Sequence, residues 1–160
     1  YPAVPCCTMD PASVRLVRDS WSQVAELGLA DVGVELFARL FAKNPSLIPS
    51  FPFASEAKDA VTIRSSQRIR RHANNVMKSL DAAIKSLDDM DAFAVSLKAL
   101  GERHVKYNVK VEYYTFIGEA ILSTLSATFK EKFTPELEKA WKTFYGVVQS
   151  TMTTGTGYTN

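Results

Sequence analysis

The sequence has 160 residues and a mass of 17.7 kDa, the size of one ordinary domain. Its 46% hydrophobic and 22% charged residues are typical of a soluble globular protein and exclude a disordered chain. The net charge of +2 is too small to predict a nucleic-acid partner, and no apolar run is long enough to predict a membrane-spanning segment. Seven glycines and seven prolines, spread through the chain, favour long helices with few breaks over an all-β fold.

Residues 1–9 form an N-terminal arm without helical periodicity. The arm holds the only two cysteines, Cys6 and Cys7, which are adjacent and cannot close an ordinary structural loop. Three interpretations of the pair stay open: free thiols, a redox sensor or a bridge between subunits. We expect the protein to be a monomer or a homodimer. We expect a cytoplasmic location. The start at Tyr1 rather than methionine indicates a processed form or part of a longer chain.

The first helices are marked by their ends. Asp10 followed by Pro11 predicts an N-cap and a first helical residue, and Gly28 loosens the end of this helix. Apolar residues then recur every three or four positions over 29–43, which predicts a second helix. Three prolines crowd residues 45–53, so we expect a short helical turn followed by irregular chain.

The middle of the chain predicts two more helices. Residues 61–87 contain no Gly or Pro and carry a strong helical stripe, which predicts one long helix. The acidic run 88–91 breaks this helix and supplies a cap for the next. Apolar residues between 93 and 104 recur at helical spacing, and Asn108 marks the turn that follows them.

The C-terminal part predicts the last two helices. One spans 111–129, and Thr134 followed by Pro135 opens the final one by the same cap-then-proline pattern. Residues 154–160, rich in Thr and Gly, predict a flexible tail. The sequence therefore predicts a single all-α domain over 10–153, with six substantial helices and at least one short one.

The only two histidines, His72 and His104, lie on the inward stripes of two different helices. Either one alone would ordinarily be a satisfied core residue, but a neutral imidazole is also the commonest metal ligand. A closed zinc site lacks further ligands nearby, whereas haem iron needs protein ligands only above and below a flat ring, in an apolar pocket. The candidate lining of such a pocket is Phe37, Phe41, Phe51, Phe53, Val76, Leu100, Val109 and Tyr114.

Other charged and polar groups carry weaker signals. Arg68, Arg70 and Arg71 flank His72 and form either a solvated face or a set of partners for haem propionates. The acidic residues of 88–91 could chelate a cation, but a charged helix break explains them as well. The sequence contains no Gly-x-Ser-x-Gly elbow and no phosphate-binding loop.

Several ordered segments together resemble the globin family, and within it the neuroglobin-like branch, over about residues 10–152. The separation of 32 positions between the two histidines agrees with that branch. The segments that carry the resemblance are Leu36-Phe37-Ala38-Arg39-Leu40-Phe41-Ala42, His72-x-x-x-Val76-Met77, Leu100-Gly101-x-x-His104, Val109-Lys110, and Phe133-Thr134-Pro135 with Trp141, Tyr145 and Gly146.

The resemblance implies a three-over-three helical sandwich around one haem b. His104 would be the proximal iron ligand and His72 the distal histidine. As a hypothesis, the Nδ1–H of His104 donates to the carbonyl of Leu100, one helical turn earlier. The cofactor-binding residues implied are Phe37, Phe41, Phe51, Phe53, Arg71, Asn75, Val76, Leu100, Arg103, Val109 and Tyr114.

The chain departs from the neuroglobin-like pattern at the pocket and at the arm. Asn75 replaces a lysine that can reach a propionate, and Phe53 replaces a tyrosine. The corner cysteines are absent, and the arm with Cys6 and Cys7 has no counterpart. These departures concern propionate contacts and redox regulation rather than haem binding.

The function implied is reversible binding of oxygen, carbon monoxide and nitric oxide, with His72 as an internal ligand and a role in gas sensing, storage or redox chemistry. A pentacoordinate globin for oxygen storage or transport is one alternative. Nitric oxide dioxygenation or nitrite reduction is another, and it would need an external reductase, so enzymatic activity stays open.

Overall fold

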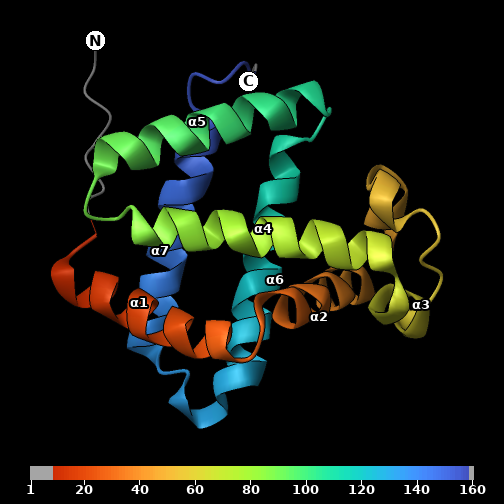
Figure 1. Ribbon diagram of the computed structural model, residues 1–160, viewed down its shortest axis with the longest axis horizontal. Coiled ribbons are helices and arrows are strands. Elements are labelled where there is room, and N and C mark those ends of the chain that lie inside the picture. Colours follow the sequence, from red (N-terminus) through yellow and green to blue (C-terminus); the bar gives the residue numbers. More distant parts are fainter. Residues whose placement is uncertain (1–8, 159–160) are drawn as a thin grey trace.

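The computed structural model describes residues 9–158, and within that range it is built from helices without any β-strand (Figure 1). The α-helices are α1 (Pro11–Glu26), α2 (Leu29–Lys43), α3 (Ala60–Ser65), α4 (Gln67–Lys85), α5 (Met90–Lys106), α6 (Val111–Phe129) and α7 (Pro135–Thr153). Three short 3-10 helices complete the order: η1 (Pro45–Ser50), η2 (Pro52–Ala54) and η3 (Lys130–Lys132). The all-α prediction, with six long helices and a short one, is confirmed.

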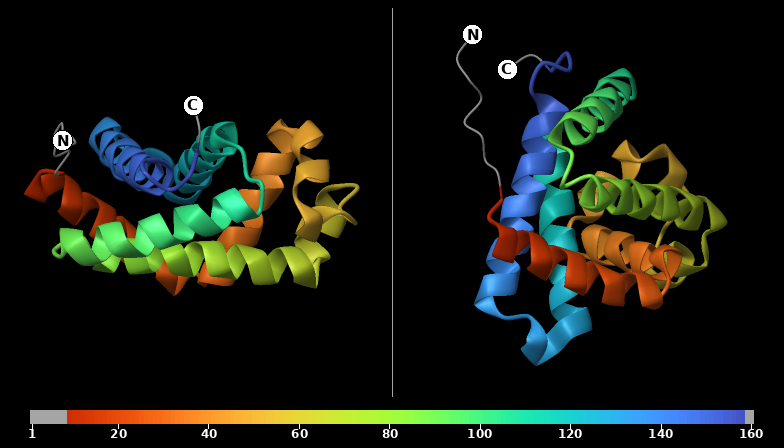
Figure 2. Two further views of the ribbon diagram at one scale, coloured as in Figure 1. Left: turned by 90° about the horizontal axis from the view of Figure 1, so that it is seen from above. Right: turned by 60° about the vertical axis from the view of Figure 1, so that its left-hand side comes forward.

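The six long helices form two layers that cross each other. In Figure 1, α4 and α5 run side by side across α6 and α7, and α1 lies in the same layer as α4. The second layer contains α2, α6 and α7, and the views of Figure 2 show the separation between the two. Helix α2 packs on both α4 and α6, while α7 packs on α1, α5 and α6. This is the three-over-three arrangement predicted from the sequence.

The N-caps predicted at Asp10 and Thr134 are present at the starts of α1 and α7. The Asp10 carboxylate accepts a hydrogen bond from the backbone N–H of Ser13 at 2.9 Å, and Thr134 accepts one from Leu137 N–H at 3.2 Å. Each cap is followed by a proline, whose missing N–H would have no helical partner at that position. Asn108, with φ of 59°, makes the predicted turn between α5 and α6.

The prediction of a single helix over residues 61–87 is wrong, because the helix is interrupted at Ser66. The backbone of Ser66 is extended (φ −70°, ψ 118°) and separates α3 from α4. Its hydroxyl accepts a hydrogen bond from the N–H of Ile69 at 3.3 Å and so caps α4. Serine competes with the helical backbone for hydrogen bonds, so a helix can end without Gly or Pro.

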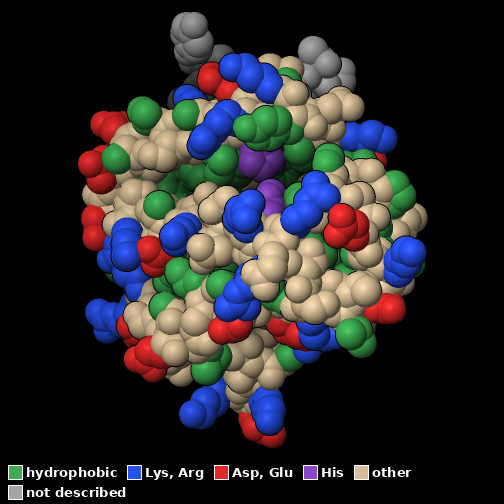
Figure 3. Space-filling model, turned by 45° about the vertical axis from the view of Figure 1, so that its right-hand side comes forward, with side chains coloured by type: hydrophobic (Ala, Val, Ile, Leu, Met, Phe, Trp, Pro, Cys, Tyr) green, Lys and Arg blue, Asp and Glu red, His purple; other side chains and the backbone are tan. Residues whose placement is uncertain are grey.

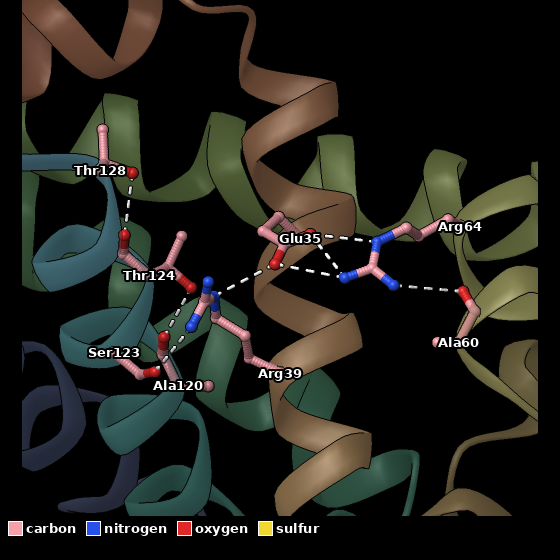
Figure 4. Close-up of polar contacts among 8 residues, drawn as sticks. All are labelled: Glu35, Arg39, Ala60, Arg64, Ala120, Ser123, Thr124 and Thr128. Atoms are coloured by element: carbon pink, nitrogen blue, oxygen red, sulfur yellow. Dashed lines mark hydrogen bonds and ion pairs between the residues drawn. The ribbon is translucent and has the colours of Figure 1, made fainter.

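An ion-pair cluster joins the short α3 to α2 (Figure 4). Glu35 of α2 binds the guanidinium of Arg64 through contacts of 3.0 to 3.4 Å. The same carboxylate lies 3.2 Å from Nε of Arg39, off the hydrogen-bonding line, so that contact is ionic. Arg39 also reaches Ser123 of α6 at 3.4 Å. The cluster holds the segment that leads into α4 close to the α2–α6 layer.

Both tryptophans have satisfied indole N–H groups and fix α1 to its neighbours. Trp141 of α7 donates to the hydroxyl of buried Ser20 at 2.9 Å, and Trp21 donates to Asp81 of α4 at 2.9 Å. Their rings lie 5.9 Å apart, and Trp141 is fully buried. A buried polar group is tolerated where it has such a partner. The bond from Trp21 thereby ties α1 to α4, the helix that carries His72.

The structure describes more of the C-terminal end of the chain than of the N-terminal arm. The N-terminal arm, with Cys6 and Cys7, lies outside the described range apart from Met9. For the predicted tail over 154–160, residues 154–158 are described, and Thr156 is buried there. Within residues 9–158, no helix has the length and apolar character required to cross a membrane.

Candidate functional site

The two histidines face one region of the molecule from neighbouring helices of one layer. His72 lies in α4, between the buried residues Ile69 and Ala73, and His104 lies near the C-terminal end of α5. Figure 3 shows both side chains on one face, beside a hollow lined by hydrophobic side chains. Lys and Arg side chains surround this face. The structure therefore brings together the two predicted metal ligands.

The ring of His104 is oriented by its own helix. Its Nδ1 lies 2.8 Å from the carbonyl oxygen of Leu100, which is the contact predicted from the sequence. Because a carbonyl only accepts, this hydrogen bond places the proton on Nδ1 and leaves the Nε2 lone pair free. The Tyr114 ring lies 5.9 Å from the His104 ring at 33°. His104 thus presents an unprotonated nitrogen in a fixed orientation.

The ring of His72 is held by aromatic side chains from α2 and from the 3-10 helix η2. It stacks on Phe53, with ring centroids 3.8 Å apart and an interplanar angle of 18°. Phe37 meets the same imidazole edge-on at 5.5 Å and 67°. Offset and edge-to-face pairs of this kind favour particular ring orientations, here that of the His72 imidazole. Phe53, predicted as a pocket residue, is in direct contact with His72.

Four phenylalanines form one wall of the site. Phe37 contacts Phe41, Phe51 and Phe53 at centroid distances of 5.5 to 6.5 Å, and Phe51 contacts Phe41 and Phe53 at 5.5 Å. Tyr113, which the sequence did not single out, extends this wall: its ring lies 5.8 Å from Phe51, and its hydroxyl donates to Ser50. The corner after α2 therefore supplies an apolar, aromatic surface beside His72.

The predicted site residues fall into three groups by exposure. Phe37, Phe41 and Tyr114 are buried. Partly buried side chains, packed on the core but with one side accessible, are Phe51, Phe53, Val76, Leu100 and Val109, together with both histidines. Arg71, Asn75 and Arg103 are exposed. This gradation fits a slot with an apolar floor and a polar rim.

Burial keeps both imidazoles uncharged at neutral pH. Desolvation, with a smaller contribution from the charge of His104, lowers the pKa of His72 to about 4. Desolvation also lowers the pKa of His104; its hydrogen bond to Leu100 opposes this change, and the charge of Arg103 reinforces it. A neutral imidazole has a lone pair available for a metal ion.

The donor set is too small for a metal held by protein alone. Among residues 9–158, no three His, Cys, Asp or Glu side chains lie close enough to hold a metal ion. A flat macrocycle would supply the remaining ligands in an apolar slot, and the imidazole nitrogens of His72 and His104 would hold its metal. Two other hollows, about 270 Å³ between α2 and α6 and about 190 Å³ between α6 and α7, contain neither histidine. The residues present therefore fit a haem group.

A two-layer all-α fold with paired neutral imidazoles beside an apolar hollow defines the class of small helical haem proteins. The globin family model matches residues 34–152. Over 140 residues the chain is 34% identical to neuroglobin of Danio rerio, covering 88% of this chain and 87% of that protein. It is 31% identical to neuroglobin of Tetraodon nigroviridis and 29% identical to that of Dissostichus mawsoni, covering 88% of each chain. The chain belongs to the globin family and is neuroglobin-like, which implies a haem cofactor.

Proposed function

We propose that this globin binds haem b in the hollow beside α4 and α5, with His104 as proximal ligand and His72 as an internal ligand in the absence of gas. The observation that carries the proposal is the pair of uncharged, partly buried imidazoles at one apolar surface. When bound, haem iron supplies the reversible binding of oxygen, carbon monoxide and nitric oxide.

The residues around each histidine support different tasks. The bond from His104 Nδ1–H to Leu100 fixes the tautomer and leaves Nε2 free to bind iron. Phe37 and Phe51 exclude water from the distal side, and His72 supplies an N–H donor there. The exposed Arg71, Asn75 and Arg103 are suited to meet the polar edge of the cofactor.

An internal ligand changes which role is favoured. If His72 occupies the sixth position, an external gas must compete with it, and the observed affinity falls by the fraction of time that the position is open. Oxygen delivery is then disfavoured, whereas gas sensing or electron transfer with an external reductase is favoured. The stack of His72 on Phe53 supports the second candidate, a pentacoordinate oxygen-storage globin, because it stabilises the ring where it stands.

Haem uptake is the direct test of the proposed site. The wild-type protein is expected to show a Soret band, and His104→Gly should lose haem faster by more than the roughly 10–100-fold typical of changes around a metal ligand. Free imidazole should restore binding to the variant, since it replaces the missing ring. Transfer of haem to a scavenger protein measures the rate.

Circular dichroism controls for folding of the His104→Gly variant, and His72→Gly is the matched change on the opposite side. A wild-type protein that takes up no haem contradicts the proposal. So does a His104→Gly variant that retains haem as firmly as the wild type without added imidazole.

The haem-free protein should lose stability in mild acid because of the buried imidazoles. The pKa of His72 is about 4 in the folded chain against an ordinary value of 6.5, so the unfolded chain binds the proton more tightly. The contribution is therefore complete above about pH 6.5 and is lost as the pH falls toward 4, by at most about 3 kcal/mol. Urea unfolding at pH 7 and pH 5 measures it. His72→Leu should show a smaller difference between the two pH values, and an equal difference contradicts the assignment.

A further inference from the structure

The chain after α7 folds back on the helices instead of leaving them. Gly155 and Gly157 have φ of 70° and 100°, which permit the tight turn. The Thr156 side chain lies inside this turn, 6% exposed, and its hydroxyl donates to the carbonyl of Met152 at 2.7 Å. A Cβ atom on Gly157 would lie 3.8 Å from Val105, so the turn touches the end of α5.

The turn delivers Tyr158 to Tyr114 of α6. The two hydroxyl oxygens are 3.2 Å apart, and the rings meet edge-on with centroids 6.0 Å apart at 82°. Tyr145 of α7 also binds Tyr114, at its main chain. The Tyr145 hydroxyl donates to the Tyr114 carbonyl at 2.7 Å. Tyr114 is therefore fixed at its side chain by the C-terminal turn and at its main chain by α7.

Tyr114 in turn lies against the histidine predicted to be the proximal ligand. Its ring centroid is 5.9 Å from that of His104, on a ring already bound at Nδ1 to Leu100. A row of three rings thus runs from His104 through buried Tyr114 to the partly buried Tyr158. Movement of Tyr114 would release one side of the imidazole.

We propose that Tyr158 is a positioning residue that acts through Tyr114 to fix the His104 ring. The proposal rests on the proposed function, because it requires His104 to be the iron ligand. The Tyr158 hydroxyl keeps Tyr114 from rotating, and the Tyr114 ring limits rotation of His104 about the bond to its helix. The chain after α7 is then part of the proximal wall of the haem site.

Tyr158→Phe in the haem-loaded protein tests this proposal, with Tyr107→Phe as the matched control. Tyr107 is 73% exposed and lies at the end of α5, so its hydroxyl should not matter. We expect Tyr158→Phe to accelerate haem loss about two- to tenfold, the range of one hydrogen bond. We also expect it to shift the iron–histidine stretching frequency, measured in a His72→Leu background where the distal ligand is removed.

The stretching frequency distinguishes a change in the position of the His104 ring from a general loss of stability, since a lower melting temperature alone would not change the frequency. If the Tyr158→Phe and Tyr107→Phe variants have the same stretching frequency and the same rate of haem loss, the proposal is overturned. Tyr158→Leu, which also removes the ring, should shift the frequency further, and no additional shift would count against a role for the ring. A His72→Leu background without any iron–histidine band would instead contradict the proposed function itself.

Discussion

His72→Leu is expected to convert the ferrous, gas-free protein from a six-coordinate to a five-coordinate haem. The wild-type spectrum should show the sharp, well-split visible bands of the low-spin form, and the variant should show one broad band. Carbon monoxide should bind the variant about tenfold faster or more, because no internal ligand then competes for the open position. Absorption spectra and rapid mixing with carbon monoxide measure the two effects.

His72→Gln separates the two tasks of the distal imidazole. Glutamine keeps an N–H donor for a bound gas but is a poor iron ligand, so it should resemble Leu in its visible spectrum. Oxygen should nevertheless leave the Gln variant more slowly than the Leu variant. A wild-type protein that already shows the broad band would contradict internal ligation and favour the pentacoordinate storage globin.

The contact with Phe53 stabilises the observed position of the His72 ring. A stacked aromatic pair is worth about 0.5–1.5 kcal/mol, and a difference of 1.4 kcal/mol corresponds to about a tenfold change in an equilibrium. The stack observed at 3.8 Å therefore stabilises one ring position against any other by up to about tenfold. Phe53, which replaces the tyrosine of the neuroglobin-like pattern, is thus coupled to the position of the His72 ring.

The sequence predicted the long helices because their periodicity and their caps agree. Asp10 and Thr134 each precede a proline and each accept the expected backbone hydrogen bond. The break at Ser66 carries no such double signal, since no Gly or Pro lies there and the apolar stripe begins only at Ile69. Only the serine hydroxyl marks the start of α4, and the presence of a serine alone does not distinguish an N-cap from a solvent-facing position within a helix. Local hydrogen bonding therefore decided a boundary that periodicity could not.

Predictions about the site succeeded where the contact lies within one helix. The bond between His104 and Leu100 follows from the direction of side chains along a helix, which point back one turn. The stack of His72 on Phe53 and the contact of Tyr158 with Tyr114 join different elements. Phe53 comes from the corner after α2 and Tyr158 from the chain after α7, and the Thr- and Gly-rich sequence around Tyr158 gives no pattern that indicates a buried contact.

Gly101→Ala is expected to separate α5 from α7 and so displace the segment that carries His104. A Cβ atom at this position would meet the carbonyl oxygen of Met152 at 2.0 Å and its carbonyl carbon at 2.8 Å. The backbone of Met152, in the last turn of α7, cannot move aside as a flexible side chain can. Forcing an extra carbon into a packed contact costs about 3 kcal/mol, which lowers the melting temperature of a chain this size by about 6–12 °C.

Gly146→Ala is the matched control, because it makes the same substitution in α7 at a site with no atom within 4 Å of the added carbon. There the change should stabilise the protein by about 0.5–1 kcal/mol, since alanine is the better helix former. Haem loss should accelerate in Gly101→Ala and stay unchanged in Gly146→Ala, because His104 lies one turn after Gly101. Calorimetry and haem transfer measure both quantities, and equal melting temperatures for the two variants would show that α5 and α7 do not meet as closely as described.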